Sequence, residues 1–193
     1  MTIHEGIFNR NRIRDKPYTQ KYIASLIGEK EGKKWLIEQG YSVYLFAFFE
    51  HTFNSLNDTI ERMKRRRKQE YMEKDRLLVE SLETQLKHVL GQDFETMKKF
   101  FLDFSPRRIE IHKSTRERMR AERRYIQIGG ISPDFIVKKN DAFSIVEVKA
   151  NTSKPTKHQK MCFDMAKNYG FNSMVLNVTV ENRLVKEIRL LPY

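Results

Sequence analysis

Residues 133–149, PDFIVKKNDAFSIVEVK, constrain the fold of this chain more than any other segment. Two apolar runs flank Asn140 and Asp141, which are turn formers that suit a two-residue hairpin loop. Counting outward from this loop places Asp134 directly opposite Glu147. Directly opposed residues point to the same face, with Cβ atoms about 4.5–5.5 Å apart. The segment therefore predicts a hairpin that brings two carboxylates together.

The same register makes both faces of the hairpin apolar. Ile136 faces Ile145 on the side of the two acids, and Phe135 faces Val146 on the other side. A strand pair that is apolar on both faces belongs in the centre of a sheet. Because two carboxylates would repel each other there, we expect a positive ion between them. Magnesium is a hard cation that takes oxygen ligands and suits this place.

The composition favours an anionic partner. The 193 residues include 37 Lys and Arg against 25 Asp and Glu, a net charge of +12. Nucleic acid is the partner that we expect first, although membranes and acidic proteins also attract such charge. A single cysteine, Cys162, excludes an internal disulfide and fits a reducing compartment. The sequence shows no hydrophobic leader and no long apolar run, which predicts a cytoplasmic protein without membrane association.

The chain divides into a core and an insertion. We expect a basic N-terminal arm at residues 1–16, a core formed by 17–53 and 125–193, and an insertion at 54–124. The insertion carries six of the twelve excess positive charges and has apolar residues near helical spacing. It is therefore predicted to be mostly helical and able to protrude as a hairpin.

Hydrophobic patterns in the core predict the order helix, strand, strand, strand, helix, strand. Besides the central hairpin, we expect a helix at 19–39, a strand at 41–49, a helix at 156–170 and a strand at 172–180. Two glycines in the first helix would allow a close approach to a neighbour. This order predicts an α/β fold, with a mixed central sheet flanked by helices.

The motif Pro-Asp, followed thirteen residues later by Glu-x-Lys, resembles the PD-(D/E)xK nucleases, which have the restriction-endonuclease-like fold. The segments GEKEGKKWLIEQGYSV and KHQKMCFDMAKNYGFNSMVLNV resemble the two core helices of that family with the strands that follow them. The likeness is greatest to Holliday-junction resolvases of the archaeal type and to VRR-NUC-type nucleases. It covers about residues 20–50 and 126–180 and implies an αβββαβ core. The insertion at 54–124 has no counterpart.

The resemblance implies a site for Mg²⁺ or Mn²⁺. Asp134 and Glu147 would be metal ligands, and the backbone carbonyl of Val148 would be a further one. Glu29, on the first helix, would complete the metal sphere, and Glu31 is an alternative two positions on. Both helix acids could instead pair with neighbouring lysines on an exposed surface.

The resemblance also gives two other residues catalytic roles. Lys149 would orient or help to deprotonate the attacking water and balance charge at the phosphate. Gln159 would lie near the scissile phosphate. However, Thr156 and Gln159 also form the T-x-x-Q pattern of a capping box, which would explain the glutamine without any catalytic role.

Two basic tracts are predicted to bind the DNA backbone, which gives affinity rather than sequence preference. The arginines concerned are Arg65, Arg66, Arg67, Arg107, Arg108, Arg116, Arg120, Arg123 and Arg124. The alternative is a solvated helix surface whose basic residues pair with nearby acids.

Taken together, the residues and the resemblance predict a magnesium- or manganese-dependent DNA endonuclease, a phosphodiester hydrolase that could prefer branched DNA. Enzymes of this family often act as homodimers, and we expect the same here. Two alternatives remain open. One is a nicking or end-processing nuclease on the same fold, and the other is a DNA-binding module without catalysis.

Overall fold

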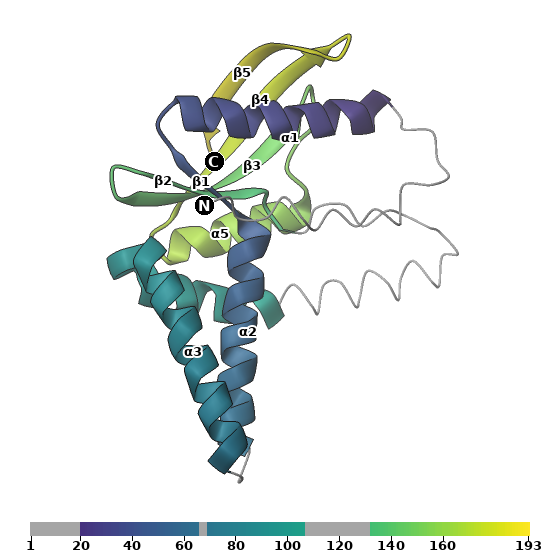
Figure 1. The fold of residues 1–193 in the computed structure, drawn as a ribbon. Coiled ribbons are helices and arrows are strands. Elements are labelled where there is room, and N and C mark those ends of the chain that lie inside the picture. Colours follow the sequence, from purple (N-terminus) through teal and green to yellow (C-terminus); the bar gives the residue numbers. More distant parts are fainter. Residues whose placement is uncertain (1–19, 66–68, 107–131) are drawn as a thin grey trace, which may run out of the picture.

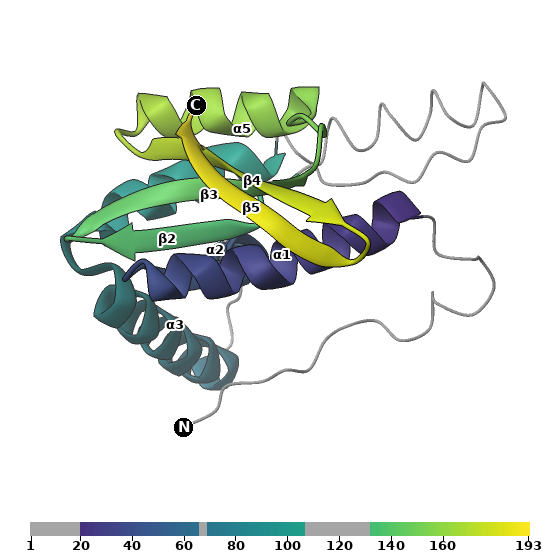
Figure 2. The same ribbon diagram turned by 90° about the horizontal axis from the view of Figure 1, so that it is seen from above.

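The computed structural model describes residues 20–65, 69–106 and 132–193. Within these ranges, five strands form one sheet in the spatial order β1-β2-β3-β4-β5. Helices lie on both sides of this sheet, and Figure 2 shows the strands between α5 and α1. The predicted α/β fold with a mixed sheet flanked by helices is therefore confirmed at this level.

The strands are β1 (Ser42–Leu45), β2 (Phe135–Lys139), β3 (Ala142–Ala150), β4 (Asn172–Glu181) and β5 (Leu184–Pro192). Neighbouring strands are antiparallel, except that β3 and β4 run parallel. Parallel strands need a crossover connection, and α5 (Lys157–Asn168) provides it. The elements at 157–168 and 172–181 match the helix and the strand predicted there.

The predicted register of the central hairpin is confirmed. Lys139 pairs with Ala142, and Asn140 and Asp141 form the loop between them. Both loop residues have positive φ, 49° and 58°, as a type I′ turn requires. Asparagine and aspartate tolerate this conformation better than most side chains, because they can form local hydrogen bonds. The turn chemistry therefore sets the pairing of β2 with β3.

Each face of the hairpin packs on its own helical layer (Figure 1). On one face Val146 and Val148 join Leu36 of α1 (Gln20–Glu38) in an apolar cluster. On the other face Ile136 and Ile145 join a larger cluster with α2, α3, residues 94–104 and α5. Burial on both faces agrees with the apolar character that the register predicts.

One element differs from the prediction. The expected strand at 41–49 ends at Leu45, and α2 (Phe46–Arg65) begins at the next residue. Phe46 and Phe49 are fully buried whereas Phe48 is 51% exposed, which is helical rather than alternating burial. A continuous apolar run suits a buried strand or a buried helix equally well, so the pattern alone could not separate them.

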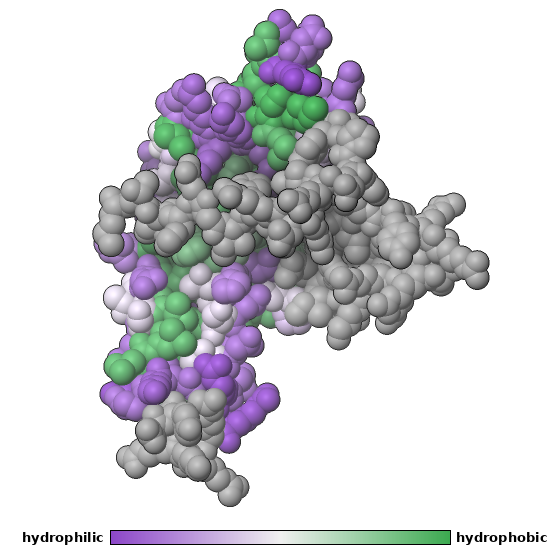
Figure 3. All heavy atoms as spheres, turned by 45° about the vertical axis from the view of Figure 1, so that its right-hand side comes forward, coloured by the Kyte–Doolittle hydropathy of each residue, from purple (hydrophilic) through white to green (hydrophobic). Residues whose placement is uncertain are grey.

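Residues after β1 build a helical layer that includes α2, α3 (Gln69–Leu90), a short 3₁₀ turn η2 (Gly91–Asp93) and helical residues 94–106. Helices α2 and α3 form a hairpin (Figure 1), and Figure 3 shows mainly hydrophilic residues on its described part next to the grey end. Arg62 joins them by a two-pronged ion pair with Asp75, with Nη2–Oδ1 at 2.9 Å and Nε–Oδ2 at 3.2 Å.

The expected boundary of the insertion at residue 54 lies inside α2. Phenylalanines on both sides of it pack together: the Phe53 and Phe101 ring centroids are 5.2 Å apart, and those of Phe46 and Phe101 are 5.1 Å apart. The same cluster contains Ile145 of the sheet. The described residues of this segment therefore contribute to the main core.

None of the described helices is long and apolar enough to cross a membrane. The expected basic arm at residues 1–16 lies outside the described residues.

The close approach of α1 to the sheet gives a first prediction. A Cβ added at Gly32 would lie 2.9 Å from Leu176 Cδ2, whereas one at Gly28 would lie 3.5 Å from Ala150 Cβ. Gly28→Ala should raise the free energy of unfolding by about 1 kcal/mol through helix propensity. Gly32→Ala should lower it by about 1 kcal/mol, because overpacking outweighs the same gain. Urea unfolding of both variants measures the difference, and equal stabilities would contradict the packing.

Candidate active site

Asp134 lies one residue before β2, at the position that the register places opposite Glu147. Its Oδ2 accepts a hydrogen bond of 2.7 Å from the backbone N–H of Val148. Its own carbonyl accepts one of 3.0 Å from the N–H of Phe46, where α2 begins. The N–H and C=O of one strand residue point to the same side, so the Val148 carbonyl also faces this edge. Asp134 and the Val148 carbonyl could therefore contact one bound cation.

Glu147 of β3 is 2% exposed and faces α5. Its Oε1 receives hydrogen bonds from Lys149 Nζ and from Gln159 Nε2, each at 2.5 Å. Its Oε2 is buried, and no described residue donates to it. Burial raises the pKa of Glu147 from 4.5 to about 8, and the nearby Asp134 adds to this, while Lys149 and Gln159 oppose it.

The pKa of Asp134 is also raised, because it is buried. The Val148 N–H and the charge of Lys149 oppose this increase. Two neighbouring carboxyl groups with raised pKa values beside a lysine make this place a candidate functional site.

Glu29 reaches the same environment from α1, on the other side of the sheet. Burial raises its pKa to about 7, and Asp134 is the next largest cause. Lys149 and a hydrogen bond with Ser25 oppose the increase. Glu31 lies two residues further along the helix, which corresponds to a rotation of about 200°, so it does not share the face of Glu29. The structure thus brings Glu29, rather than Glu31, within electrostatic reach of Asp134 and Lys149.

Gln159 forms the predicted capping box and also contacts Glu147, whereas its place near a scissile phosphate stays a prediction. Its backbone N–H donates to Thr156 Oγ1 at 3.2 Å, and its Oε1 accepts from the Thr156 N–H at 2.8 Å, which completes a capping box at α5. Its Nε2 is left to donate to Glu147. The cap therefore fixes the side chain that holds the buried carboxylate.

The donor set fits a divalent cation bound partly by water. Among the described residues, no three His, Cys, Asp or Glu side chains are close enough to hold a metal by themselves. However, Mg²⁺ is usually held by one or two carboxylates together with water and substrate phosphates. With a cation bound, the three acids would be ionised, and together with one lysine they would carry two negative charges, which one divalent cation offsets. The unpartnered Oε2 of Glu147 supports the same fit.

Sequence reasoning missed one buried acid near this site. Glu50 of α2 is 5% exposed and accepts a hydrogen bond of 3.3 Å from the Ser132 hydroxyl. Like Glu147, it helps to raise the pKa of the buried Cys162 thiol, although burial is the main cause. The sequence predicted a strand at 41–49, which would have placed Glu50 in the loop after it. In the structure α2 begins at Phe46, and Glu50 lies one helical turn further on the same buried face. Its contact with Ser132 ties α2 to the segment that leads into Asp134.

The predicted DNA-binding arginines are mostly outside the described residues. These are Arg66, Arg67, Arg107, Arg108, Arg116, Arg120, Arg123 and Arg124. Arg65 is exposed at the end of α2, and a rise of 1.5 Å per residue places it about 28 Å along the helix from Phe46. Arg65 therefore lies far from Asp134.

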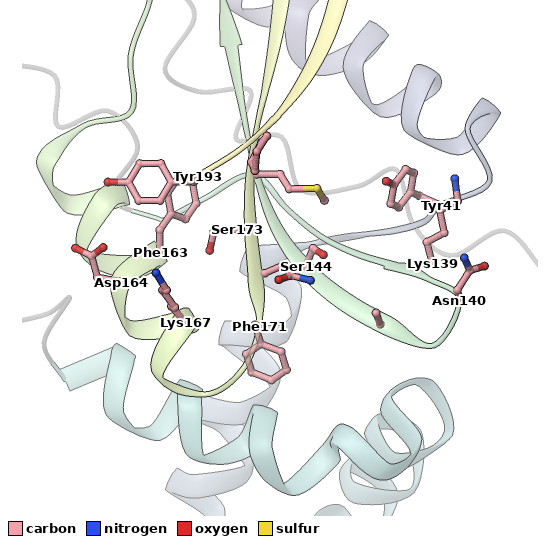
Figure 4. Close-up of a pocket in the computed structure, with 14 residues that line it drawn as sticks. Tyr41, Lys139, Asn140, Ser144, Phe163, Asp164, Lys167, Phe171, Ser173 and Tyr193 are labelled. Carbon is pink, nitrogen blue, oxygen red and sulfur yellow. The ribbon is translucent and has the colours of Figure 1, made fainter.

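A pocket of about 580 Å³ lies at the other end of the sheet (Figure 4). Lys139 and Asn140 of the β2–β3 turn line it together with Ser173, Phe163 and Tyr193. None of the acidic residues described above contributes to it. It is therefore distinct from the candidate site.

Comparison with known proteins finds no family model, no curated protein and no solved structure that matches this chain. The chemistry of the site must therefore be argued from its own residues.

The raised pKa of Glu147 predicts how metal-free protein responds to pH. A carboxyl group whose pKa is higher in the folded state stabilises the fold fully below its ordinary pKa and loses that contribution as pH rises through the folded value. The free energy of unfolding of wild type relative to Glu147→Gln should therefore fall between about pH 4.5 and 8. Urea unfolding in EDTA across this range measures it. A constant difference would show that Glu147 is not a strained buried acid.

The two roles of Gln159 can be separated by comparing two variants. Thr156→Ala removes the cap and should cost about 1 kcal/mol at every pH. Gln159→Met removes the cap interaction and also a donor to Glu147, so its cost should grow by about 1–3 kcal/mol as pH rises through about 8. The free energy of unfolding of both variants, measured by urea unfolding below and above pH 8, separates the two roles. Parallel pH profiles for the two variants would reduce Gln159 to a capping residue.

Proposed function

We propose that this chain is a Mg²⁺- or Mn²⁺-dependent DNA endonuclease of the PD-(D/E)xK type, with a restriction-endonuclease-like core. The observation that carries the proposal is the buried Glu147, which lies beside Asp134 and is held by Lys149 and Gln159. A buried carboxylate is costly for stability, since ionised groups lose hydration in the interior. Its retention next to a second acid and a lysine is best explained by chemistry on an anionic substrate.

The residues that would hold the cation are Asp134, Glu147 and the carbonyl of Val148. Glu29 would complete its surroundings, acting through a bound water because it does not form a three-acid group with the other two. When bound, the cation would polarise the scissile phosphate and lower the pKa of a water molecule. Carboxylates and a carbonyl are the hard oxygen ligands that Mg²⁺ and Mn²⁺ accept.

The other side chains would position the reacting groups. The Lys149 side chain is 13% exposed and its Nζ contacts Glu147 Oε1, so the ammonium group can also face a phosphate oxygen or the attacking water. Its positive charge would stabilise the charge that develops at phosphorus. Gln159 keeps Glu147 in place through the cap of α5. The protein therefore contributes orientation and electrostatic stabilisation, which account for most catalysis of this kind.

DNA is the proposed substrate because the chain carries a net charge of +12. The phosphate backbone supplies most of the affinity of such proteins. Arg65 lies about 28 Å along α2 from Phe46. It could therefore contact a DNA phosphate about one turn of the double helix away from the cut. A homodimer would let two such sites cut both strands and is part of the proposal. A non-catalytic DNA-binding module is less favoured, since binding alone needs no buried carboxylate pair.

Cleavage of plasmid, linear duplex and four-way-junction DNA tests this function. Asp134→Asn keeps an acceptor for the Val148 N–H, and Glu147→Gln keeps one for Lys149 and Gln159, so both variants should fold. We expect Mg²⁺-dependent cleavage by wild type, and a loss of more than about 100-fold in either variant. Lys149→Met should lose a similar amount. Asp164→Asn is the matched control, because this exposed acid on α5 lies outside the site.

Metal binding provides a second readout. Mn²⁺ should raise the melting temperature of wild type and of Asp164→Asn, but not of Glu147→Gln. Survival of cleavage in both acid variants would place the site elsewhere. Binding of DNA without cleavage of any substrate would favour the DNA-binding module.

A further inference from the structure

A second pocket of about 680 Å³ lies on the α1 face of the sheet. It lies between α1 and the end of the β4–β5 hairpin, and Ile27 and Ala150 are part of its lining. Ala150 directly follows Lys149 along β3, and a Cβ on Gly28, beside Glu29, would be 3.5 Å from it. Side chains alternate along a strand, so Ala150 faces α1, whereas Lys149 and Glu147 face the other side of the sheet. The pocket therefore lies on the side from which Glu29 approaches Asp134 and Lys149.

The pocket has an apolar floor and a polar rim. Ile23, Ala24 and Ile27 of α1 form part of the floor with Ala150. The rim includes Thr152 and Ser153 after β3 and the turn residues Asn182 and Arg183. In Figure 3, apolar and hydrophilic residues lie side by side at this hairpin. Such a lining suits a ligand that combines an apolar part with an anionic part, and the volume is within the range of small-ligand pockets.

Arg183 is the residue that indicates the charge of the ligand. It is exposed at the tip of the β4–β5 turn, and no described residue forms an ion pair or a hydrogen bond with it. Its guanidinium is therefore available to an anion, and this group binds phosphate by two parallel hydrogen bonds.

The turn itself is not optimal for an arginine. Asn182 and Arg183 have φ of 50° and 65° between paired Glu181 and Leu184, which is a two-residue type I′ loop. Glycine is strongly preferred at the second position of such a loop, since a side chain there is strained. The arginine is thus kept at a place where stability alone would favour glycine, and strained residues of this kind concentrate at functional sites.

We propose that this pocket binds one nucleotide of the DNA strand next to the phosphate that is cut, with Arg183 on its phosphate and the sugar and base against the apolar floor. The inference rests on the proposed nuclease function and adds the place where the substrate strand lies. Three features support it: a position on the side of the sheet from which Glu29 approaches Asp134 and Lys149, a guanidinium without a partner among the described residues, and a lining that matches the mixed character of a nucleotide.

The test compares Arg183→Gly, Arg183→Lys and a matched control, Arg189→Gln. Arg189 lies on β5 and pairs with Glu187 at 2.6 Å, and it does not line the pocket. Binding of a fluorescein-labelled DNA duplex is measured by anisotropy in Ca²⁺ to avoid cleavage, over a series of salt concentrations. Melting temperature is recorded for every variant.

We expect Arg183→Gly to bind DNA about tenfold more weakly, with the slope of log K against log salt flatter by about 0.9. The same variant should melt about 2–4 °C higher, because the turn strain is relieved. Arg183→Lys should keep the wild-type salt slope but only part of the affinity, because an ammonium group cannot form the two parallel hydrogen bonds, and Arg189→Gln should behave as wild type. This opposite movement of affinity and stability is not expected of a structural residue.

Unchanged binding by Arg183→Gly, or an equal loss in Arg189→Gln, would overturn the inference while wild-type cleavage still supports the nuclease. Failure of wild type to bind or cut DNA would instead refute the proposed function itself. The two failures are therefore distinguishable in the same set of measurements.

Discussion

The two-residue turn at Asn140 and Asp141 is the constraint on which the rest of the site depends. It sets the register of β2 and β3, and side chains alternate between faces along a strand. A slip by one residue would turn Glu147 toward α1 and bring Val146 to the position beside Gln159. The turn residues adopt positive φ with side chains that tolerate it, so local chemistry and long-range packing favour the same register. The position of the acidic pair follows directly from this agreement.

Burial of Glu147 links the packing of the fold to its proposed chemistry. The same core that buries Ile145 places the carboxylate two residues further on, away from water. Only Lys149 and Gln159 donate to it among the described residues, and Gln159 is available because Thr156 caps α5. An apolar side chain would be more stable at this position, since a buried ion pair rarely repays its desolvation. The arrangement therefore costs stability and creates a charged, water-poor place where a cation and a phosphate would interact strongly.

The sequence predicted the parts of this arrangement that local rules decide. The hairpin register, the capping box at Thr156 and the coarse α/β architecture each depend on residues close together in the chain. The start of α2 could not be predicted, because an apolar run suits a buried strand and a buried helix alike, and Glu50 was hidden for that reason. The choice between Glu29 and Glu31 depends on how α1 rotates against the sheet, which is a property of tertiary packing.

The position of α2 suggests how substrate choice could be separated from chemistry. Its first N–H holds the backbone of Asp134, and the helix then extends about 28 Å to Arg65, joined to α3 by the ion pair of Arg62 with Asp75. A centre built from carboxylates and a lysine interacts with phosphate, which is the same at every base pair. In the proposed nuclease, any preference for a DNA shape would therefore come from surfaces at a distance from the centre. The α2–α3 hairpin is connected to the centre through Asp134 and the shared phenylalanine core, so in the proposed nuclease it would hold such a surface about 28 Å from the start of α2.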